Sequence, residues 1–226
     1  YIPGEVLGTI KQLSNENYQE NHKFYVDGTP TVSDAFVGGA WRTVLVGGLN
    51  KGGQSIYALD VTNPAGFSEG SAASIFKWEF TDEEDADLGY TYSRPAIVKL
   101  NDGTWAAVFG NGHNNTVADG QASTTGDAVL YVVNLDTGAL IKKITTSTGV
   151  AEDPTGQSRP NGLATVAPVD LQDDGKIDYI YAGDLFGNMW KFDLSSSNKN
   201  QWKLDYRIFA ACEDITCTNE KQQPIT

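Results

Sequence analysis

Four aspartates stand close together in one short stretch of the chain, VDLQDDGKIDYIYAG at residues 169–183. They are Asp170, Asp173, Asp174 and Asp178, and an apolar segment follows them at once. Two carboxylates about 4 Å apart repel each other by roughly 4 kcal/mol at an effective dielectric constant of about 20. A divalent cation between them reverses the sign of that energy. The density of carboxylates in this stretch therefore points to metal binding.

The oxygen-bearing residues of this loop follow the order in which a calcium loop wraps its ion. A calcium ion takes about six to eight oxygen ligands, and a glycine at position six supplies the sharp turn. With Asp170 as position one, Gln172 is position three, Asp174 is position five and Gly175 is position six. Lys176 at position seven would contribute its backbone carbonyl, and Asp178 is position nine. We therefore predict a Ca²⁺ site made by these residues, with the glycine as the turn.

A solvated acidic turn is the alternative, because Asp-Asp-Gly is a common turn sequence. A helical EF-hand is excluded, since its twelfth position, here Tyr181, must be a glutamate and the flanks here are predicted strands. Magnesium is less suited, because it demands octahedral geometry and keeps several waters. Asp173 falls out of phase with the other aspartates and is expected to face solvent. The second acidic run, residues 82–87, lacks the glycine and is expected to be a solvated loop between repeat units.

Charge and cysteine content narrow the partners and the compartment. The chain of 226 residues has 16 basic and 29 acidic residues, a net charge of -13, so nucleic acid and anionic membrane surfaces would be repelled. No apolar run approaches the roughly 18 residues of a membrane-spanning helix, so no membrane span is expected. Four residues separate Cys212 from Cys217, which predicts a small disulfide loop or, alternatively, two free thiols.

A pattern of proline, glycine and aromatic strand recurs three times along the chain. The prolines are Pro30, Pro95 and Pro168, and Gly47, Gly110 and Gly183 follow them after 17, 15 and 15 residues. The third segment of each unit reads IYALDV, LYVVNL or MWKFDL, alternating as a half-buried strand does. A fourth segment closes each unit: SIFKWEF, LIKKITT and QWKLDYRIF. Four short antiparallel strands per repeat are typical of a β-propeller blade.

We therefore predict an all-β fold, a modified β-propeller with four-stranded antiparallel blades at about residues 29–80, 93–146 and 164–210. A generic β-sandwich is the alternative that short alternating strands also permit. Propellers close with about four to eight blades, so residues 1–226 are expected to be part of one larger ring, with both flanks in incomplete blades. The acidic loop then becomes the turn between the first and second strands of the third blade.

Several segments together resemble the C-terminal domain of the PilY1 family, also called PilC, of the type IV pilus. These segments cover nearly the whole chain and read FYVDGTPTVSDAF, RTVLVGGLNKGGQSIYALDVT, DLGYTYSRPAIVKL, VFGNGHNN with VLYVVNLDTGALIKKI, and YAGDLFGNMWKFDL. The resemblance implies a modified propeller with a calcium loop. That loop falls on the same residues that the chemistry selects: Asp170, Gln172, Asp174, the Lys176 carbonyl and Asp178. The departure is Gln172, where Asn or Asp is usual in the family.

The resemblance also implies a function and a location. It implies a non-enzymatic, calcium-binding domain at the pilus tip or outer membrane surface, outside the cell, which regulates pilus extension and retraction, twitching motility and adhesion. Its partners would be other type IV pilus components, the minor pilins, and host or abiotic surfaces. The variable N-terminal region of the family is absent from this sequence.

Two other functions compete with this interpretation. YVVNLDTGALI and YALDVT are similar to blades of quinoprotein dehydrogenases, but the adjacent cysteine pair of those enzymes is missing, and a shared fold does not imply shared chemistry. The other possibility is a calcium-stabilised propeller that serves only as a binding scaffold. In that case loss of calcium would unfold the domain, whereas a regulatory calcium could be lost without loss of the fold.

Overall fold

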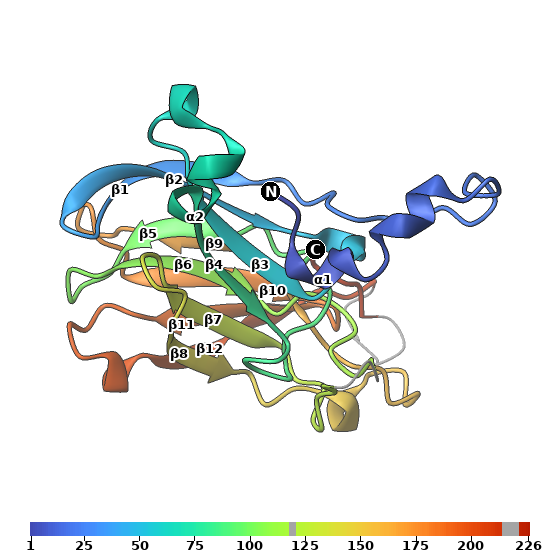
Figure 1. The fold of residues 1–226 in the computed structure, drawn as a ribbon. Helices are drawn as coiled ribbons and strands as arrows, with labels where there is room; N and C mark the ends of the chain where they lie inside the picture. The colour runs from blue at the N-terminus through green and yellow to red at the C-terminus, as the bar shows by residue number, and fades with distance from the viewer. Residues whose placement is uncertain (118–120, 214–221) are drawn as a thin grey trace.

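Three four-stranded antiparallel sheets make up the chain in a computed structural model that describes residues 1–117, 121–213 and 222–226. Figure 1 shows them following one another along the chain, from blue through green to red. Within each sheet the strands are hydrogen-bonded in chain order, so each sheet is an up-and-down meander. This is the predicted all-β fold of four-stranded blades.

The strand bounds agree closely with the three predicted repeat units. The first sheet has β1 Thr31–Val37, β2 Ala40–Gly48, β3 Ser55–Asp60 and β4 Phe76–Thr81. The second has β5 Ala96–Lys99, β6 Trp105–Gly110, β7 Val129–Asn134 and β8 Leu140–Thr145. The third has β9 Leu163–Val169, β10 Tyr179–Asp184, β11 Asn188–Asp193 and β12 Lys203–Ala210.

Helical structure in the described residues is limited to single turns. The two α-helical turns are α1 Gly4–Leu7 and α2 Ala72–Ile75. The 3₁₀ turns are Ile10–Ser14, Asn50–Gly52, Pro64–Gly66, Glu69–Ser71, Val150–Glu152 and Lys199–Gln201. The turn α2 corrects the expected start of the fourth strand, because Ser74 and Ile75 belong to it and β4 begins at Phe76.

The middle sheet is buried on both faces, which the alternating pattern did not predict for β7. Residues 129–133 of this strand are all fully buried. One face of the sheet contributes Phe109 and Tyr131 to a core shared with the first sheet. The opposite face contributes Val108 and Leu130 to a core shared with the third sheet. A strand between two layers needs apolar residues on both sides, so its sequence reads as a nearly continuous apolar run.

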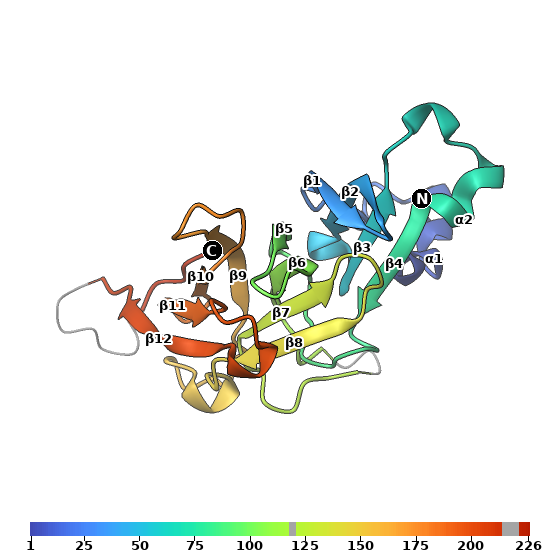
Figure 2. The ribbon, with the colours of Figure 1, turned by 90° about the vertical axis from the view of Figure 1, so that its left-hand side faces the viewer.

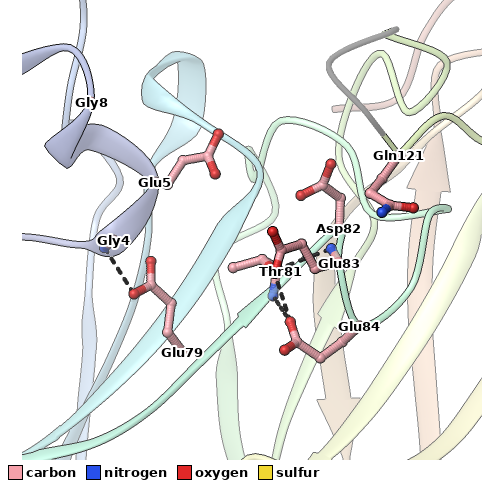
Figure 3. Close-up of a pocket in the computed structure, with 9 residues that line it drawn as sticks. All are labelled: Gly4, Glu5, Gly8, Glu79, Thr81, Asp82, Glu83, Glu84 and Gln121. Atoms are coloured by element: carbon pink, nitrogen blue, oxygen red, sulfur yellow. Dashed lines mark hydrogen bonds between the residues drawn. The ribbon is translucent and has the colours of Figure 1, made fainter.

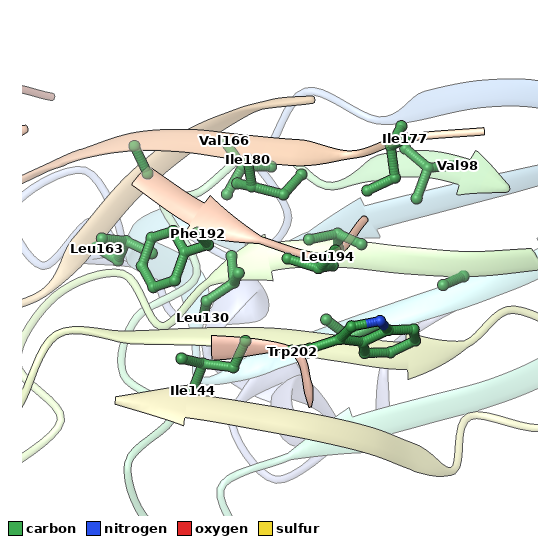
Figure 4. Packing of buried hydrophobic residues seen from close by; sticks show 14 of the residues in the cluster. Val98, Leu130, Ile144, Leu163, Val166, Ile177, Ile180, Phe192, Leu194 and Trp202 are labelled. Carbon is green, nitrogen blue, oxygen red and sulfur yellow. The ribbon is translucent and has the colours of Figure 1, made fainter. Parts of the chain in front are cut away.

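The core between the second and third sheets lies directly beneath the predicted calcium loop. Figure 4 shows Leu130 of β7 among Phe192, Leu194 and Trp202, which the third sheet and its last turn contribute. Ile177, the residue before the last predicted ligand, packs in the same core and is 7% exposed. Burial of this side chain anchors one end of the loop, because removing a large aliphatic residue from water stabilises its position by about 1.5–3 kcal/mol.

The first strands of the three sheets lie side by side, and the fourth strands form the outer edges. β1 contacts β5, and β5 contacts β9. Figure 2 shows β9, β5 and β1 next to one another across the upper part of the molecule, with β8 and β12 below. This is how blades surround a propeller axis.

A glycine in the second strand marks where the next segment of chain crosses each sheet. A Cβ on Gly110 would lie 2.4 Å from the carbonyl oxygen of Leu163, at the start of the third sheet. A Cβ on Gly183 would lie 2.5 Å from the carbonyl oxygen of Ile225. The backbone N–H of Ile225 donates to the carbonyl of Asp184 at 3.0 Å. Residues 222–226 thus follow the path of an incoming first strand, although the assignment of both flanks to further blades stays a prediction.

Candidate calcium site

The predicted calcium loop is the connection between β9 and β10. Val169 and Tyr179 face each other as the last pair of the two strands. The backbone N–H of Asp178 donates to the Val169 carbonyl at 2.8 Å and closes the loop. The position expected from the sequence, between the first and second strands of the third blade, is therefore confirmed.

Asp178 is the buried member of the predicted ligand set, with only 3% of its surface exposed. Its Oδ2 accepts a hydrogen bond from the backbone N–H of Leu171 at 2.7 Å. From the second sheet, the Asn101 amide donates to the Ile177 carbonyl at 2.7 Å and approaches Asp178 Oδ1 at 3.5 Å. This carboxylate is held by the loop backbone at Leu171 and lies close to Asn101 of the neighbouring blade.

Asp170 shapes the loop from its other end. Its Oδ1 accepts from the N–H of Asp174 at 3.2 Å, and its Oδ2 accepts from the N–H of Gly175 at 2.7 Å. The chain curls back to make these bonds through left-handed residues, Asp173 with φ 57° and Gly175 with φ 79°. Gly175 is the residue type that tolerates this backbone without cost. The prediction that Gly175 makes the sharp turn of the loop is therefore confirmed.

Asp174 is the exposed carboxylate of the predicted ligand set, and its partner is a lysine of the same loop. Its Oδ2 lies 2.8 Å from Lys176 Nζ, and its Oδ1 accepts from the Lys176 N–H at 2.9 Å. The hydrogen bond from the Lys176 ammonium lowers the pKa of the Asp174 carboxyl, with the Lys176 N–H as the second cause. The same contact raises the pKa of Lys176. The lysine thus occupies part of the space beside this carboxylate that a metal cation would need.

Gln172 reaches back across the loop to Asp178. With its amide nitrogen turned toward the carboxylate, it donates to Oδ1 at 2.8 Å and also to Oδ2. With its oxygen turned that way, two acceptors would face each other, which is stable only with a cation between them. The side chain that departs from the family pattern is therefore within reach of the innermost carboxylate in either orientation.

The structure brings the predicted ligands into one loop but does not gather their carboxylates. Among the described residues, no three His, Cys, Asp or Glu side chains are placed to hold a metal ion. Asp170 and Asp174 are instead hydrogen-bonded to N–H groups of the loop. The donor set is one that calcium prefers, namely oxygens only, on a curled loop. Forming a calcium shell would require Asp174 to leave Lys176.

Sequence reasoning missed two residues that shape this loop. Asn101 lies 77 positions before Asp178 in the chain, and only the folded sheets bring it close. Lys176 was assigned through its backbone carbonyl, whereas its side chain is the cation that the loop already has. The Lys176 contact could have been found, because a lysine two residues from an aspartate in a tight turn can reach its carboxylate. Asp173 is exposed, as predicted.

The second acidic run connects the first and second sheets, as expected, but it is not fully solvated. Asp82 is 8% exposed, and Lys143 Nζ lies 2.6 Å from Asp85 Oδ1 and 2.6 Å from Asp87 Oδ2. The buried Tyr131 hydroxyl donates to Asp85 Oδ1 at 2.8 Å. The expectation of a solvated loop was wrong for Asp82, Asp85 and Asp87. Lys143 on β8 draws Asp85 and Asp87 against the second sheet, and the Gln54 amide donates to Asp82 Oδ2 at 3.0 Å.

The largest described cavity is acidic and lies beside this second run, between it and the N-terminal turn. It measures about 620 Å³, and its carboxylates are Glu5, Glu79, Asp82, Glu83 and Glu84. Figure 3 shows that several of them are engaged: Glu79 accepts from the Gly4 N–H, and Glu84 accepts from Thr81. The predicted calcium loop does not line this cavity.

Two further expectations concern the disulfide and the absence of a membrane-spanning helix. Cys217 lies outside the described residues, so its disulfide with Cys212 stays a prediction. In the part of the chain that the structure describes, no helix is long and apolar enough to span a membrane.

Comparison with known proteins places these observations in a family. The family model described as the PilY1 beta-propeller domain matches residues 3–221. A type IV pilus biogenesis factor PilY1 homolog of Xylella fastidiosa is 46% identical over 211 residues, which cover 92% of this chain and 13% of that protein. The type IV pilus biogenesis factor PilY1 of Pseudomonas aeruginosa is 41% identical over 204 residues, 89% of this chain and 16% of that protein.

A solved structure agrees in fold as well as in sequence. The crystal structure of the Pseudomonas aeruginosa PilY1 C-terminal domain superposes with a TM-score of 0.72 at 33% identity and covers 93% of this chain and 41% of that one. The chain thus spans 13% of the length of the Xylella relative and 16% of the Pseudomonas one.

Proposed function

The chain belongs to the PilY1 β-propeller family, and on that premise we propose that it is a propeller segment of a type IV pilus biogenesis factor. Its curated relatives are named as biogenesis factors rather than as enzymes, which supports a non-enzymatic role. The chain spans only a small part of the length of those relatives.

The loop of residues 170–178 is proposed to bind Ca²⁺ in this role. The observation that carries the proposal is the curl of the loop, in which Asp170 accepts from the N–H groups of Asp174 and Gly175. Asp170, Asp174 and Asp178 would supply carboxylate oxygens, while Gln172 and the Lys176 carbonyl would supply neutral ones. A bound cation would neutralise the loop, which carries four aspartates and one lysine.

The finer function is proposed to be regulatory. A calcium-dependent loop on an extracellular propeller at the pilus tip would couple calcium concentration to pilus extension and retraction, and so to twitching motility and adhesion. Its partners would be minor pilins. The exposure of Asp174 supports a reversible site, because an ion held at the surface can exchange without opening the core.

The test is a pair of chromosomal variants in the organism that carries the protein. Asp174→Asn removes one charged ligand, and Asp173→Asn removes a neighbouring charge that lies outside the proposed site. We expect altered surface piliation and twitching for Asp174→Asn alone, with an unchanged circular dichroism spectrum of the purified chain. Normal piliation and twitching with Asp174→Asn would contradict the regulatory role.

The same variants separate regulation from a purely structural calcium. Asn101 ties the loop to the second sheet, so a structural ion would stabilise the contact between two blades. In that case Asp174→Asn would lower the melting temperature in calcium and would change the spectrum near physiological temperature. Loss of twitching together with loss of the fold would favour the scaffold function.

A further inference from the structure

A second cavity, of about 270 Å³, lies where the chain enters the first strands of the three sheets. Its described lining includes Thr29, Asn50, Tyr92, Arg94 and Thr165, and no carboxylate. The acidic cavity of Figure 3 is the opposite case, with five carboxylates and no basic residue in its described lining. In a chain of net charge -13, it is unusual for the described lining of a cavity to contain a basic side chain, here Arg94, and no acidic one.

The first and third sheets both contact Arg94, which lies just before the first strand of the second sheet. Its backbone N–H donates to Thr165 Oγ1 of the third sheet at 3.3 Å, and its Nε donates to Thr31 Oγ1 of the first sheet at 3.2 Å. The Thr31 hydroxyl in turn donates to the Pro95 carbonyl at 2.7 Å. In Figure 2, the strands that supply these contacts, β1, β5 and β9, lie next to one another. The guanidinium is therefore positioned through Nε.

The two terminal nitrogens of Arg94 have no acceptor within the described residues. The three other arginines each have one: Arg42 pairs with Asp60, Arg159 pairs with Asp153, and Arg207 donates to Asn188 Oδ1. A guanidinium carries five N–H donors in a fixed plane, and a carboxylate accepts two of them in parallel. The Nε atom of Arg94 is therefore held by Thr31, while its two terminal nitrogens are free to donate to a ligand.

Two hydroxyl groups that line the same cavity as this arginine could donate hydrogen bonds to a ligand. The hydroxyls of Thr29 and Tyr92 have no hydrogen-bond partner among the described residues, and both residues line the cavity. The Tyr92 ring is held by stacking on His113, with centroids 4.6 Å apart. Burial raises the pKa of Tyr92, with the charge of Asp27 as a second cause, and Asp27 does not line the cavity.

Two backbone segments approach each other closely in the lining of the cavity, at Gly28 and Gly48. A Cβ on Gly28 would lie 2.2 Å from the carbonyl oxygen of Gly48, so only glycine fits there. The hydroxyls of Thr91 and Ser93, which also line the cavity, are saturated by backbone groups. The free donors of the described lining therefore include the terminal nitrogens of Arg94 and the hydroxyls of Thr29 and Tyr92.

We propose that this cavity binds a carboxylate group, which the two terminal nitrogens of Arg94 grip in parallel while a hydroxyl of Thr29 or Tyr92 donates to it. The planar fork favours a carboxylate over a spherical anion such as chloride. The carboxylate could belong to a small organic acid or to the acidic side chain of a partner protein. This site goes beyond the proposed function and does not depend on calcium.

The test is a titration of the purified, isotope-labelled chain at constant ionic strength, followed by backbone amide NMR. Sodium acetate represents the free acid, and N-acetylglutamate amide represents an acidic side chain. We expect saturable shifts at Thr29 and Arg94 with a dissociation constant of about 1–10 mM. A tighter constant for acetate would favour the free acid as the source, and a tighter one for the glutamate derivative would favour a partner protein. Shifts that follow only ionic strength would overturn the site.

Variants of two arginines decide the residue assignment. Arg94→Gln should weaken binding by about tenfold or more, which corresponds to about 1.4 kcal/mol. Arg42→Gln, which alters an arginine outside the cavity, should bind like the parent chain. If Arg94→Gln fails to fold, Arg94→Lys keeps the charge without the fork and should also bind more weakly. Parent-like affinity in either Arg94 variant would overturn the proposal, and tighter binding of phosphate than of either carboxylate would overturn the assignment to a carboxylate.

Discussion

The two acidic runs of this chain both crowd carboxylates into a short stretch, but they obtain their counter-charges differently. In residues 82–87, Asp85 and Asp87 share the Lys143 ammonium, and the buried Tyr131 hydroxyl donates to Asp85. In residues 170–178, the one ion pair is the exposed contact of Asp174 with Lys176. The first run obtains its cation from a strand of the next sheet. The second obtains one only from within its own loop.

Burial explains the difference. A carboxylate that is taken out of water must be paired or hydrogen-bonded, because the uncompensated charge costs several kcal/mol. The run between sheets is pressed against β7 and β8, so the fold supplies the counter-charge itself. In the loop between β9 and β10, Asp174 is exposed and the buried Asp178 accepts from the Leu171 N–H, so no lysine of a neighbouring sheet is needed and the carboxylates are left to backbone N–H groups and to ions from solution. The first run is therefore a structural contact, and the second is a candidate cation site.

The largest expected effect is on the structural run. Lys143→Met should lower the free energy of unfolding by about 2–3 kcal/mol, since it leaves two partly buried carboxylates without their cation. Urea unfolding followed by tryptophan fluorescence measures this. Lys142→Met, on the neighbouring residue of β8, is the matched control and should cost much less. Equal losses for both variants would show that the ion pairs contribute nothing specific.

Calcium should stabilise the chain by a smaller amount through the second run. With a dissociation constant of about 10⁻³ M, as in extracellular modules, about 10 mM calcium adds roughly 1.4 kcal/mol to the free energy of unfolding. Differential scanning calorimetry should show a higher melting temperature with calcium than with chelator. Lys143→Met should retain this increment, because the two runs are independent. Loss of the increment in that variant would mean that the runs are coupled.

Asn101 tests how firmly the second loop is tied to the neighbouring blade. Its amide donates to the carbonyls of Ile177 and Leu194. Asn101→Ala should lower the free energy of unfolding by about 1 kcal/mol, because partly buried carbonyls lose a donor. Asn200→Ala, on the exposed last turn of the third sheet, should leave stability unchanged in the same urea titration. If Asn200→Ala lowered the free energy of unfolding as much as Asn101→Ala, the contacts of Asn101 would not be what links the loop to the neighbouring blade.

The pH dependence of stability should test the ion pairs of the first run. Burial by itself lowers the pKa of Lys143, but the hydrogen bonds that its ammonium donates to Asp85 and Asp87 outweigh this effect, so the pKa is raised. A raised pKa contributes stability that is present below the ordinary lysine value of about 10.4 and is lost as the pH rises through the folded-state pKa. The difference in stability between the parent chain and Lys143→Met should therefore shrink at alkaline pH. A difference that stays constant there would contradict the ion-pair account.

Much of the fold was predictable because its signals are local and repeated. The glycine of each second strand and the aromatic third strand placed all three sheets, and the oxygen spacing from Asp170 to Asp178 located the loop and its turn. The double burial of β7 was not predictable from its own pattern, since it depends on sheets packing on both sides. The contacts of Asn101 and Lys143 join segments far apart in sequence, as do those of Arg94. No local spacing records such contacts.

The central claim is that the second run lacks a sufficient cation of its own and takes one from solution. Isothermal titration of the purified, chelator-treated chain with calcium chloride tests it most directly, alongside Asp174→Asn and Asp173→Asn. The account predicts one saturable site that Asp174→Asn weakens by about tenfold or more and that Asp173→Asn leaves within about twofold of the parent. No saturable heat in the parent chain, or equal weakening by both variants, would contradict it.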